Sequence, residues 1–257
     1  MQNETSDQSR SLRPAFLLPV RSIIFILVSV IGTAVTGKAL ADIGSWWSLT
    51  ATAVNLVMIL AFIIYSKKTG ISFSLFMTDY PVMLKRRRDE AATLKKTALL
   101  VLAFAAVGMG GMYLSGLICY GSIMPRVTLD IVAPITPALA VINFILLPAT
   151  VSFAEDGLYL GCGVRSIGNK YAAVIIPAFF YALQHCFIPT YADAKYMIYR
   201  FLSFLPLTVI FCIHYRRHRD PVPIMISHAL LDLATSSLIL MTSVSPEIYE
   251  KMQEMMK

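Results

Sequence analysis

Residues 131–163 read IVAPITPALAVINFILLPATVSFAEDGLYLGCG, an apolar run that carries two adjacent acids, Glu155 and Asp156, towards its carboxyl end. About 20 apolar residues in a helix cross the hydrocarbon core of a bilayer. A helix also satisfies its own backbone hydrogen bonds, which lipid cannot do. We therefore predict a long transmembrane helix here. Each acid costs at least about 2.5 to 3.5 kcal/mol at the centre of such a helix, so the pair indicates a polar site inside the membrane.

The rest of the chain is similarly apolar. Of its 257 residues, 57% are hydrophobic and only 14% are charged, against about 25% charged in a soluble domain. Its mean hydropathy is +0.68. We predict an all-α polytopic transmembrane helix bundle of seven to eight spans that forms a single membrane domain. Besides 131–163, the expected spans are 22–35, 46–65, 97–118, 171–189, 200–214 and 222–241.

Two parts are expected within this membrane domain. Residues 1–130 hold the amino-terminal spans and an interfacial basic loop, whereas 131–241 hold the helices with ionisable residues. In the loop, residues 70–84 mix apolar and polar side chains and lead into Lys-Arg-Arg-Arg at 85–88. This pattern predicts a helix lying on the anionic inner leaflet, with a specific lipid or protein receptor as the alternative.

The basic residues indicate the orientation of the protein. The formal charge of +7 comes from residues at the ends of apolar segments and not from a stripe interleaved with aromatic residues, so no nucleic acid is expected as a partner. Arg10, Arg13 and Arg21 precede the first span and place the amino terminus in the cytosol. We expect a location in the bacterial plasma membrane. The first span could instead be a signal peptide, because Ala-Leu-Ala at 39–41 resembles a cleavage site.

Ionisable residues away from the membrane interfaces gather in the carboxy-terminal half of the chain. Because the expected spans before Ala154 hold essentially none, the group indicates one polar site. These residues are Glu155, Asp156, His185, His228 and Asp232.

The spacing of these residues predicts that they meet. Around a turn near Gly168, Glu155 lies about 20 Å before the turn and His185 about 25 Å after it, at 1.5 Å per residue. They therefore face each other if the fourth helix continues to about Val164, being long, tilted or bent near Pro148. His228 and Asp232 are four residues apart and share one helix face. A tilted helix or a water-filled cavity is needed to bring all five residues together.

Three short motifs carry a resemblance to a known family. They are Glu155-Asp156-Gly-Leu-Tyr-Leu160, Tyr181-Ala-Leu-Gln-His185 and His228-Ala-Leu-Leu-Asp232. In this order the chain resembles the CPBP family of intramembrane CAAX-type and bacteriocin-processing endopeptidases, whose motifs are EExxxR, FxxxH and HxxxN or HxxxD. Asp156, Tyr181 and Leu160 depart from this pattern.

The missing arginine at Leu160 is the most serious of these departures. Arg165 does not replace it, because ten residues from Glu155 place it about 280° around an α-helix. Asp156 is then expected to be protonated or to pair with another group. A catalytically silent member that regulates a membrane protein partner is one alternative function, which Leu160 favours. A proton-coupled transporter is another, because intramembrane acids and histidines also form proton relays.

The resemblance implies an enzyme that hydrolyses a peptide bond of a membrane-associated, prenylated or leader peptide substrate. Glu155 would be the general base beside His185, and His228 would donate to the oxyanion with Asp232 fixing its orientation. Asp156 belongs to the same expected site. No cofactor is expected. Zinc is the alternative, and its ligands would then be Glu155, His185 and His228.

Overall fold

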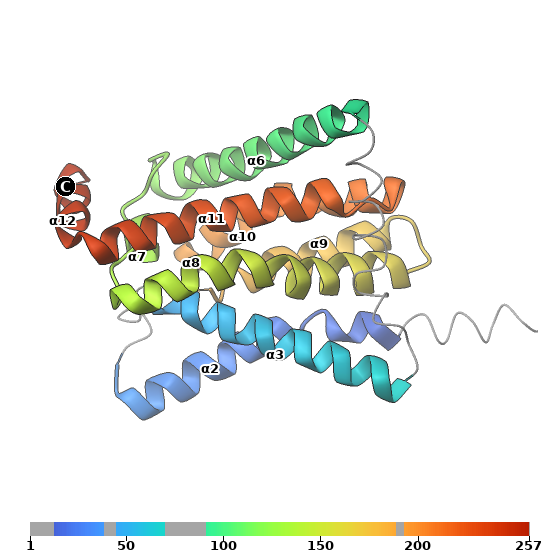
Figure 1. Cartoon of the computed structure of the whole chain (residues 1–257), viewed down its shortest axis with the longest axis horizontal. Helices are drawn as coiled ribbons and strands as arrows, with labels where there is room; N and C mark the ends of the chain where they lie inside the picture. Colours follow the sequence, from blue (N-terminus) through green and yellow to red (C-terminus); the bar gives the residue numbers. More distant parts are fainter. Residues whose placement is uncertain (1–12, 39–44, 70–90, 189–192, 257) are drawn as a thin grey trace, which may run out of the picture.

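The computed structural model describes residues 13–38, 45–69, 91–188 and 193–256 (Figure 1). Every regular element within these ranges is a helix, which confirms the predicted all-α fold class. The predicted interfacial helix at 70–84 and the basic cluster at 85–88 lie outside the described residues.

Six helices in the described part of the chain are long and apolar enough to cross a membrane, so the chain is an integral membrane protein. A shorter apolar helix, α9, corresponds to the fifth predicted span. Two short helices, α7 and α12, lie near one end of the bundle (Figure 1). In chain order the elements are η1 (Arg13–Leu17), α2 (Val20–Thr36), α3 (Trp46–Thr69), α6 (Ala91–Tyr120), α7 (Val127–Ile131), α8 (Pro137–Val151), η3 (Ser152–Val164), α9 (Ala172–Gln184), α10 (Ala194–His218), α11 (Val222–Val244) and α12 (Pro246–Met255).

The long helices lie roughly along one common axis (Figure 1). Helix α6 packs on α10 and α11, whereas α3 packs on α8 and η3, and α2 packs on α9. Large apolar side chains on the outside remain uncovered by protein; Leu102 is 66% exposed and Ile145 is 60% exposed. Such surfaces suit contact with lipid tails and not with water. The polar side chains in the middle of the bundle are consequently the informative ones.

The fourth span changes its helical form just before the acids. Helix α8 contains Pro148, which has no backbone N–H to donate, and the π-helical segment η3 begins at Ser152. A π turn holds more residues than an α turn, so adjacent side chains diverge by less than the roughly 100° of an α-helix. Glu155 and Asp156 can therefore both point inward, and both are buried. The span continues to Val164, as the sequence predicted.

Gly163 allows the ends of three elements to come close together. A Cβ atom at this position would lie 2.9 Å from Cγ of Pro177 on α9 and 3.0 Å from Cδ2 of Leu18, which precedes α2. Both distances are shorter than an ordinary carbon contact of about 3.5 to 4.0 Å. The glycine thus brings α9 and the start of α2 against η3.

Candidate active site

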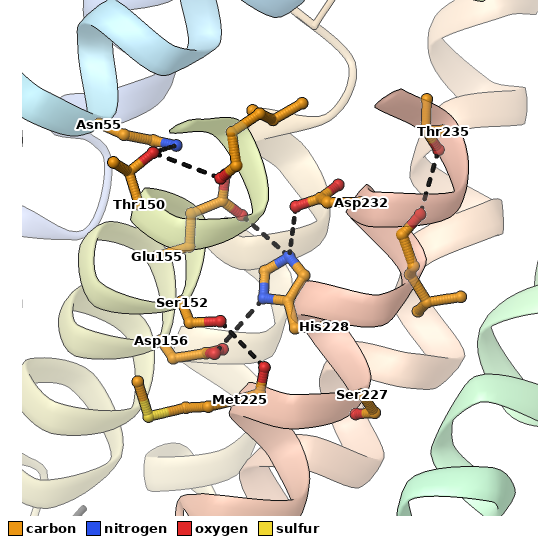
Figure 2. A network of polar contacts seen from close by, with 12 residues as sticks. Asn55, Thr150, Ser152, Glu155, Asp156, Met225, Ser227, His228, Asp232 and Thr235 are labelled. Atoms are coloured by element: carbon orange, nitrogen blue, oxygen red, sulfur yellow. Dashed lines mark hydrogen bonds and ion pairs between the residues drawn. The ribbon is translucent and has the colours of Figure 1, made fainter. Parts of the chain in front are cut away.

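The five predicted site residues come together inside the bundle. Glu155 and Asp156 lie on η3, His185 follows the last residue of α9, and His228 and Asp232 lie one turn apart on α11. Figure 2 shows His228 between the two acids of η3 on one side and Asp232 on the other. Apart from Asp232, which is partly buried, all of them are buried.

Four side-chain atoms form a chain of near contacts in this site. Oε2 of Glu155 lies 3.9 Å from Nε2 of His185 and 3.8 Å from Nε2 of His228. The same Nε2 atom of His228 lies 3.8 Å from Oδ2 of Asp232. These distances are too long for direct hydrogen bonds but suit a bridging water. Within the described part of the chain, the buried Oδ2 of Asp232 has no hydrogen-bond partner. The four atoms can therefore share a small polar ligand.

The orientation of His228 is set through its Nδ1 atom. The Tyr181 hydroxyl donates to Oδ1 of Asp156 at 2.7 Å and lies 2.9 Å from His228 Nδ1, which is 3.4 Å from Oδ2 of Asp156. Because the hydroxyl has one proton and gives it to Asp156, Nδ1 carries the proton in the bond to Tyr181. Tyr181 and Asp156 therefore hold His228 in place, whereas Asp232 was expected to fix its orientation.

Arg21 supplies a positive charge to the site and was not among the predicted site residues. We interpreted this residue as a topology signal before the first span, but it is fully buried on α2. Its guanidinium donates to Oε1 of Glu155 at 2.7 Å. As predicted, Arg165 points away and is exposed. Asp156 pairs with Tyr181 and His228 and not with a cation of its own helix.

Uncharged polar residues complete the surroundings of Glu155. Arg21 also donates to Gln184 Oε1 at 2.6 Å and to Asn55 Oδ1 at 2.7 Å, and Gln184 Nε2 donates to Glu155 Oε2 at 2.6 Å. The Asn55 amide reaches Thr150 at 3.2 Å. Only ionisable residues were predicted for the site from the sequence, and these amides were not among them. An amide in the middle of an apolar span was the available signal.

His185 is held from the side of α10. Its ring stacks on Phe204 with centroids 3.5 Å apart and planes 7° from parallel. Arg200 donates to the backbone carbonyls of His185 at 3.3 Å and Ile188 at 2.8 Å. These carbonyls lie just beyond the carboxyl end of α9, where a helix leaves acceptors unpaired. The imidazole consequently has a fixed position opposite Glu155.

The residues named as zinc ligands in the alternative are not grouped as a metal site in this arrangement. Among the described residues, no three His, Cys, Asp or Glu side chains are grouped so that they could hold a metal ion. The two oxygens of Glu155 already accept hydrogen bonds, one from Arg21 and the other from Gln184. The set Glu155, His185 and His228 therefore does not fit zinc as the side chains lie.

An apolar groove runs beside the site, between α11 and the fourth span. Its volume is about 520 Å³, and Met225 and Ala229 line it on the same turns of α11 that carry His228. On the other side, Ser152 donates to the backbone carbonyl of Met225 at 3.0 Å and ties η3 to α11. The remaining lining residues are Phe144, Ile145, Pro148, Ala149, Phe153, Ile226, Leu230 and Leu233.

Comparison with known proteins identifies the segment that carries the site. Residues 137–234 match the family model described as type II CAAX prenyl endopeptidase Rce1-like, and they include all five predicted site residues. Neither the curated proteins nor the solved structures compared with the chain include a match. The resemblance to CPBP-type endopeptidases is thereby confirmed. Residues 137–234 are therefore similar to the Rce1-like CAAX endopeptidases, a likeness that supports a membrane endopeptidase in general kind.

Proposed function

We propose that this protein hydrolyses a peptide bond of a membrane-associated substrate by means of a water molecule held between Glu155 and His185. The observation that carries the proposal is the 3.9 Å separation of Glu155 Oε2 from His185 Nε2, which one water can bridge. A general base must lie within hydrogen-bond reach of the proton that it abstracts, directly or through one water. Both side chains meet this requirement.

Glu155 has the capacity to act as the base. Each carboxylate oxygen has two lone pairs. Oε1 accepts from Arg21 and Oε2 accepts from Gln184, so Oε2 keeps one acceptor position for the water. The carboxylate takes the proton as the water attacks the carbonyl carbon and returns it to the leaving amine.

His228 is placed to stabilise the oxyanion. Its Nδ1 proton is engaged with Tyr181, so Nε2 donates a hydrogen bond in the imidazolium form of the ring. In that form the positive charge lies between the carboxyl groups of Asp156 and Asp232. A donor fixed before the reaction stabilises negative charge as it develops, without reorganisation.

The groove beside α11 supports a substrate with an apolar membrane anchor, such as a prenylated tail or the apolar part of a leader peptide. Ala229 in the groove directly follows His228, so an anchor lying there holds the attached peptide next to the site. Most ligand-binding clefts likewise combine apolar walls with a few placed polar groups.

The peptide itself is expected to approach from the cytosol. His228 lies six residues from the start of α11, or about 9 Å along the helix axis. Arg216, Arg217 and Lys170 lie together around one cavity near this end of the bundle. Because cytosolic loops are rich in Lys and Arg, this end faces the cytosol, as does the amino terminus.

The alternative of a silent, partner-regulating protein was favoured by Leu160, which leaves the acids without the motif's arginine. Arg21 provides a cation at 2.7 Å from Glu155, so this reason for preferring the alternative no longer applies. A complete set of base, histidines and counter-charge favours the enzyme.

The proposal can be tested with Glu155→Gln, which keeps the size of the side chain and removes the base. The purified protein, in vesicles that contain anionic lipid, is incubated with a prenylated peptide, its unprenylated form and a leader peptide. Cleavage by the wild type and a loss of roughly 10²- to 10⁴-fold in the variant are expected. Glu250→Gln, at an exposed position on α12, is the matched control. Equal cleavage by Glu155→Gln and the control would exclude Glu155 as the base.

A further inference from the structure

The positive charge beside the catalytic acid comes from a different helix than the family motif implies. The EExxxR pattern places arginine five residues after its first glutamate, and here that position is the buried Leu160. Five residues is also the hydrogen-bond repeat of a π-helix, so Leu160 lies one turn of η3 from Glu155. Because leucine carries no charge, this position supplies no cation to Glu155 in this chain, although an arginine there would lie one turn away.

Arg21 supplies that charge instead, and each nitrogen of its guanidinium donates a hydrogen bond. Its Nε donates to Gln184, its Nη1 to Asn55 and its Nη2 to Glu155, at distances of 2.6 to 2.7 Å. Its side chain is 0% exposed. A buried guanidinium is tolerated when it is paired with an acid and hydrogen-bonded, and each of the three nitrogens of Arg21 has a partner. The three partners lie on α9, α3 and η3.

Arg21 also determines which way the Gln184 amide points. Gln184 Oε1 accepts from Arg21 Nε at 2.6 Å and from the Tyr159 hydroxyl at 3.2 Å. The amide nitrogen must then face Glu155 Oε2, to which it donates at 2.6 Å. Arg21 therefore fixes both oxygens of the carboxylate, one directly and one through Gln184. This contact directs the free acceptor position of Oε2 towards the histidines.

We propose that Arg21 is a positioning residue that replaces the motif's arginine, so that the first span completes the active site of the carboxy-terminal domain. The inference depends on the proposed peptidase function. It extends the site beyond the matched segment of residues 137–234 to α2, and it favours a retained first span over a cleaved signal peptide. The close approach of Leu18 to Gly163 supports it independently, because this contact fixes the chain three residues before Arg21.

Relocating the charge tests the proposal. In Arg21→Leu, kcat is expected to fall by about 100-fold with little change in KM, because Arg21 aligns the base but is not expected to contact substrate. Adding Leu160→Arg to this variant returns the charge to the position of the family motif. The kcat of the double variant is expected to be at least about tenfold higher than that of Arg21→Leu. Arg217→Leu, at an exposed position, is the matched control and should retain full activity.

A stability cycle keeps the test valid if Arg21→Leu folds poorly. The melting temperatures of the wild type, Arg21→Leu, Glu155→Gln and the double variant are compared in the same detergent. The double variant should be more stable than Arg21→Leu, because it no longer buries an unpaired carboxylate.

The two hypotheses fail in different ways. A wild type that cleaves none of the peptides excludes the proposed function, while the stability cycle still reports whether the two side chains are coupled. An active wild type with an equally active Arg21→Leu variant, or strictly additive changes in melting temperature, overturns the role of Arg21.

Discussion

The Nε2 atom of His185 lies 3.9 Å from Oε2 of Glu155, although the residues are 30 positions apart and lie on successive helices. Each of them is fixed by another helix: Glu155 by Arg21 of α2 and His185 by Phe204 of α10. The distance between the base and the imidazole is therefore held by four helices. Such a site depends on the packing of the bundle and not only on the residues that react.

Replacing the imidazole tests its contribution. His185→Gln keeps a hydrogen-bonding side chain but cannot act as an imidazole, so kcat is expected to fall roughly 10²- to 10⁴-fold. Initial rates of cleavage of a membrane-anchored peptide measure the change. His218→Gln, on the exposed last turn of α10, is the control and should cleave at the wild-type rate. A similar loss in both variants would point to a general effect on the membrane protein.

The Tyr181 hydroxyl is expected to matter for both rate and stability. Tyr181→Phe removes the donor to Asp156 and the acceptor for His228, so the free energy of unfolding should fall by about 1 to 3 kcal/mol. His228 loses its orientation, and kcat should fall more than KM changes. Thermal melts and steady-state kinetics measure the two effects. Tyr199→Phe, another fully buried tyrosine, lies on α10 and serves as the control.

Much of the fold could be predicted because a bilayer imposes simple rules on sequence. Six of the seven predicted spans correspond to helices long enough to cross a membrane, and the fifth corresponds to the shorter helix α9. The continuation of the fourth span to Val164 and the meeting of Glu155 with His185 followed from hydropathy and the rise of a helix. The change to π-helical form at Ser152 was not predicted. It depends on backbone hydrogen bonds that span five residues instead of four, and no periodic pattern in the sequence records them.

The site was predicted less completely than the fold, for a definite physical reason. Glu155, Asp156, His185, His228 and Asp232 were found because ions inside an apolar span are costly and therefore conspicuous. Arg21 stands at the start of its span, where arginines are common and usually face the interface. The packing of α2 against η3 and α9 decides its role. That packing is a long-range property which local sequence patterns do not contain.

Filling the apolar groove should impair substrates with a membrane anchor selectively. Ala229→Phe adds a ring on the groove wall beside His228, so KM for a prenylated peptide is expected to rise about tenfold or more. KM for a short peptide without an anchor should change little. Ala234→Phe, an exposed position on the same helix outside the groove, is the control. Equal effects on both peptides would show that the anchor binds elsewhere.

Removal of metal ions is expected to leave activity intact. The side chains of Glu155, His185 and His228 are not grouped as a metal site, and the proposed mechanism needs only side-chain groups and water. The wild-type protein is dialysed against a strong chelator and assayed in metal-free buffer. Loss of cleavage that added zinc restores would instead assign Glu155, His185 and His228 as ligands after a rearrangement of their side chains.

Gly163 links the packing of the bundle to the geometry of the site. In Gly163→Ala the new methyl group would lie 2.9 Å from Cγ of Pro177, a rigid ring on α9, so α9 must move away from η3. His185 follows the last residue of α9, and its distance to Glu155 should therefore increase. We expect the free energy of unfolding to fall by about 1 to 3 kcal/mol, the usual cost of overpacking.

The activity of Gly163→Ala should fall further than its stability explains. A misplacement of about 1 Å between reacting groups can cost roughly 10²-fold in rate, even when most molecules remain folded. Assays well below the melting temperature separate the two effects. Gly110→Ala is the matched control, because a Cβ atom at this position on α6 meets nothing within 4 Å. If Gly163→Ala is destabilised but cleaves at the rate of this control, the contact with Pro177 serves folding alone and does not set the distance between Glu155 and His185.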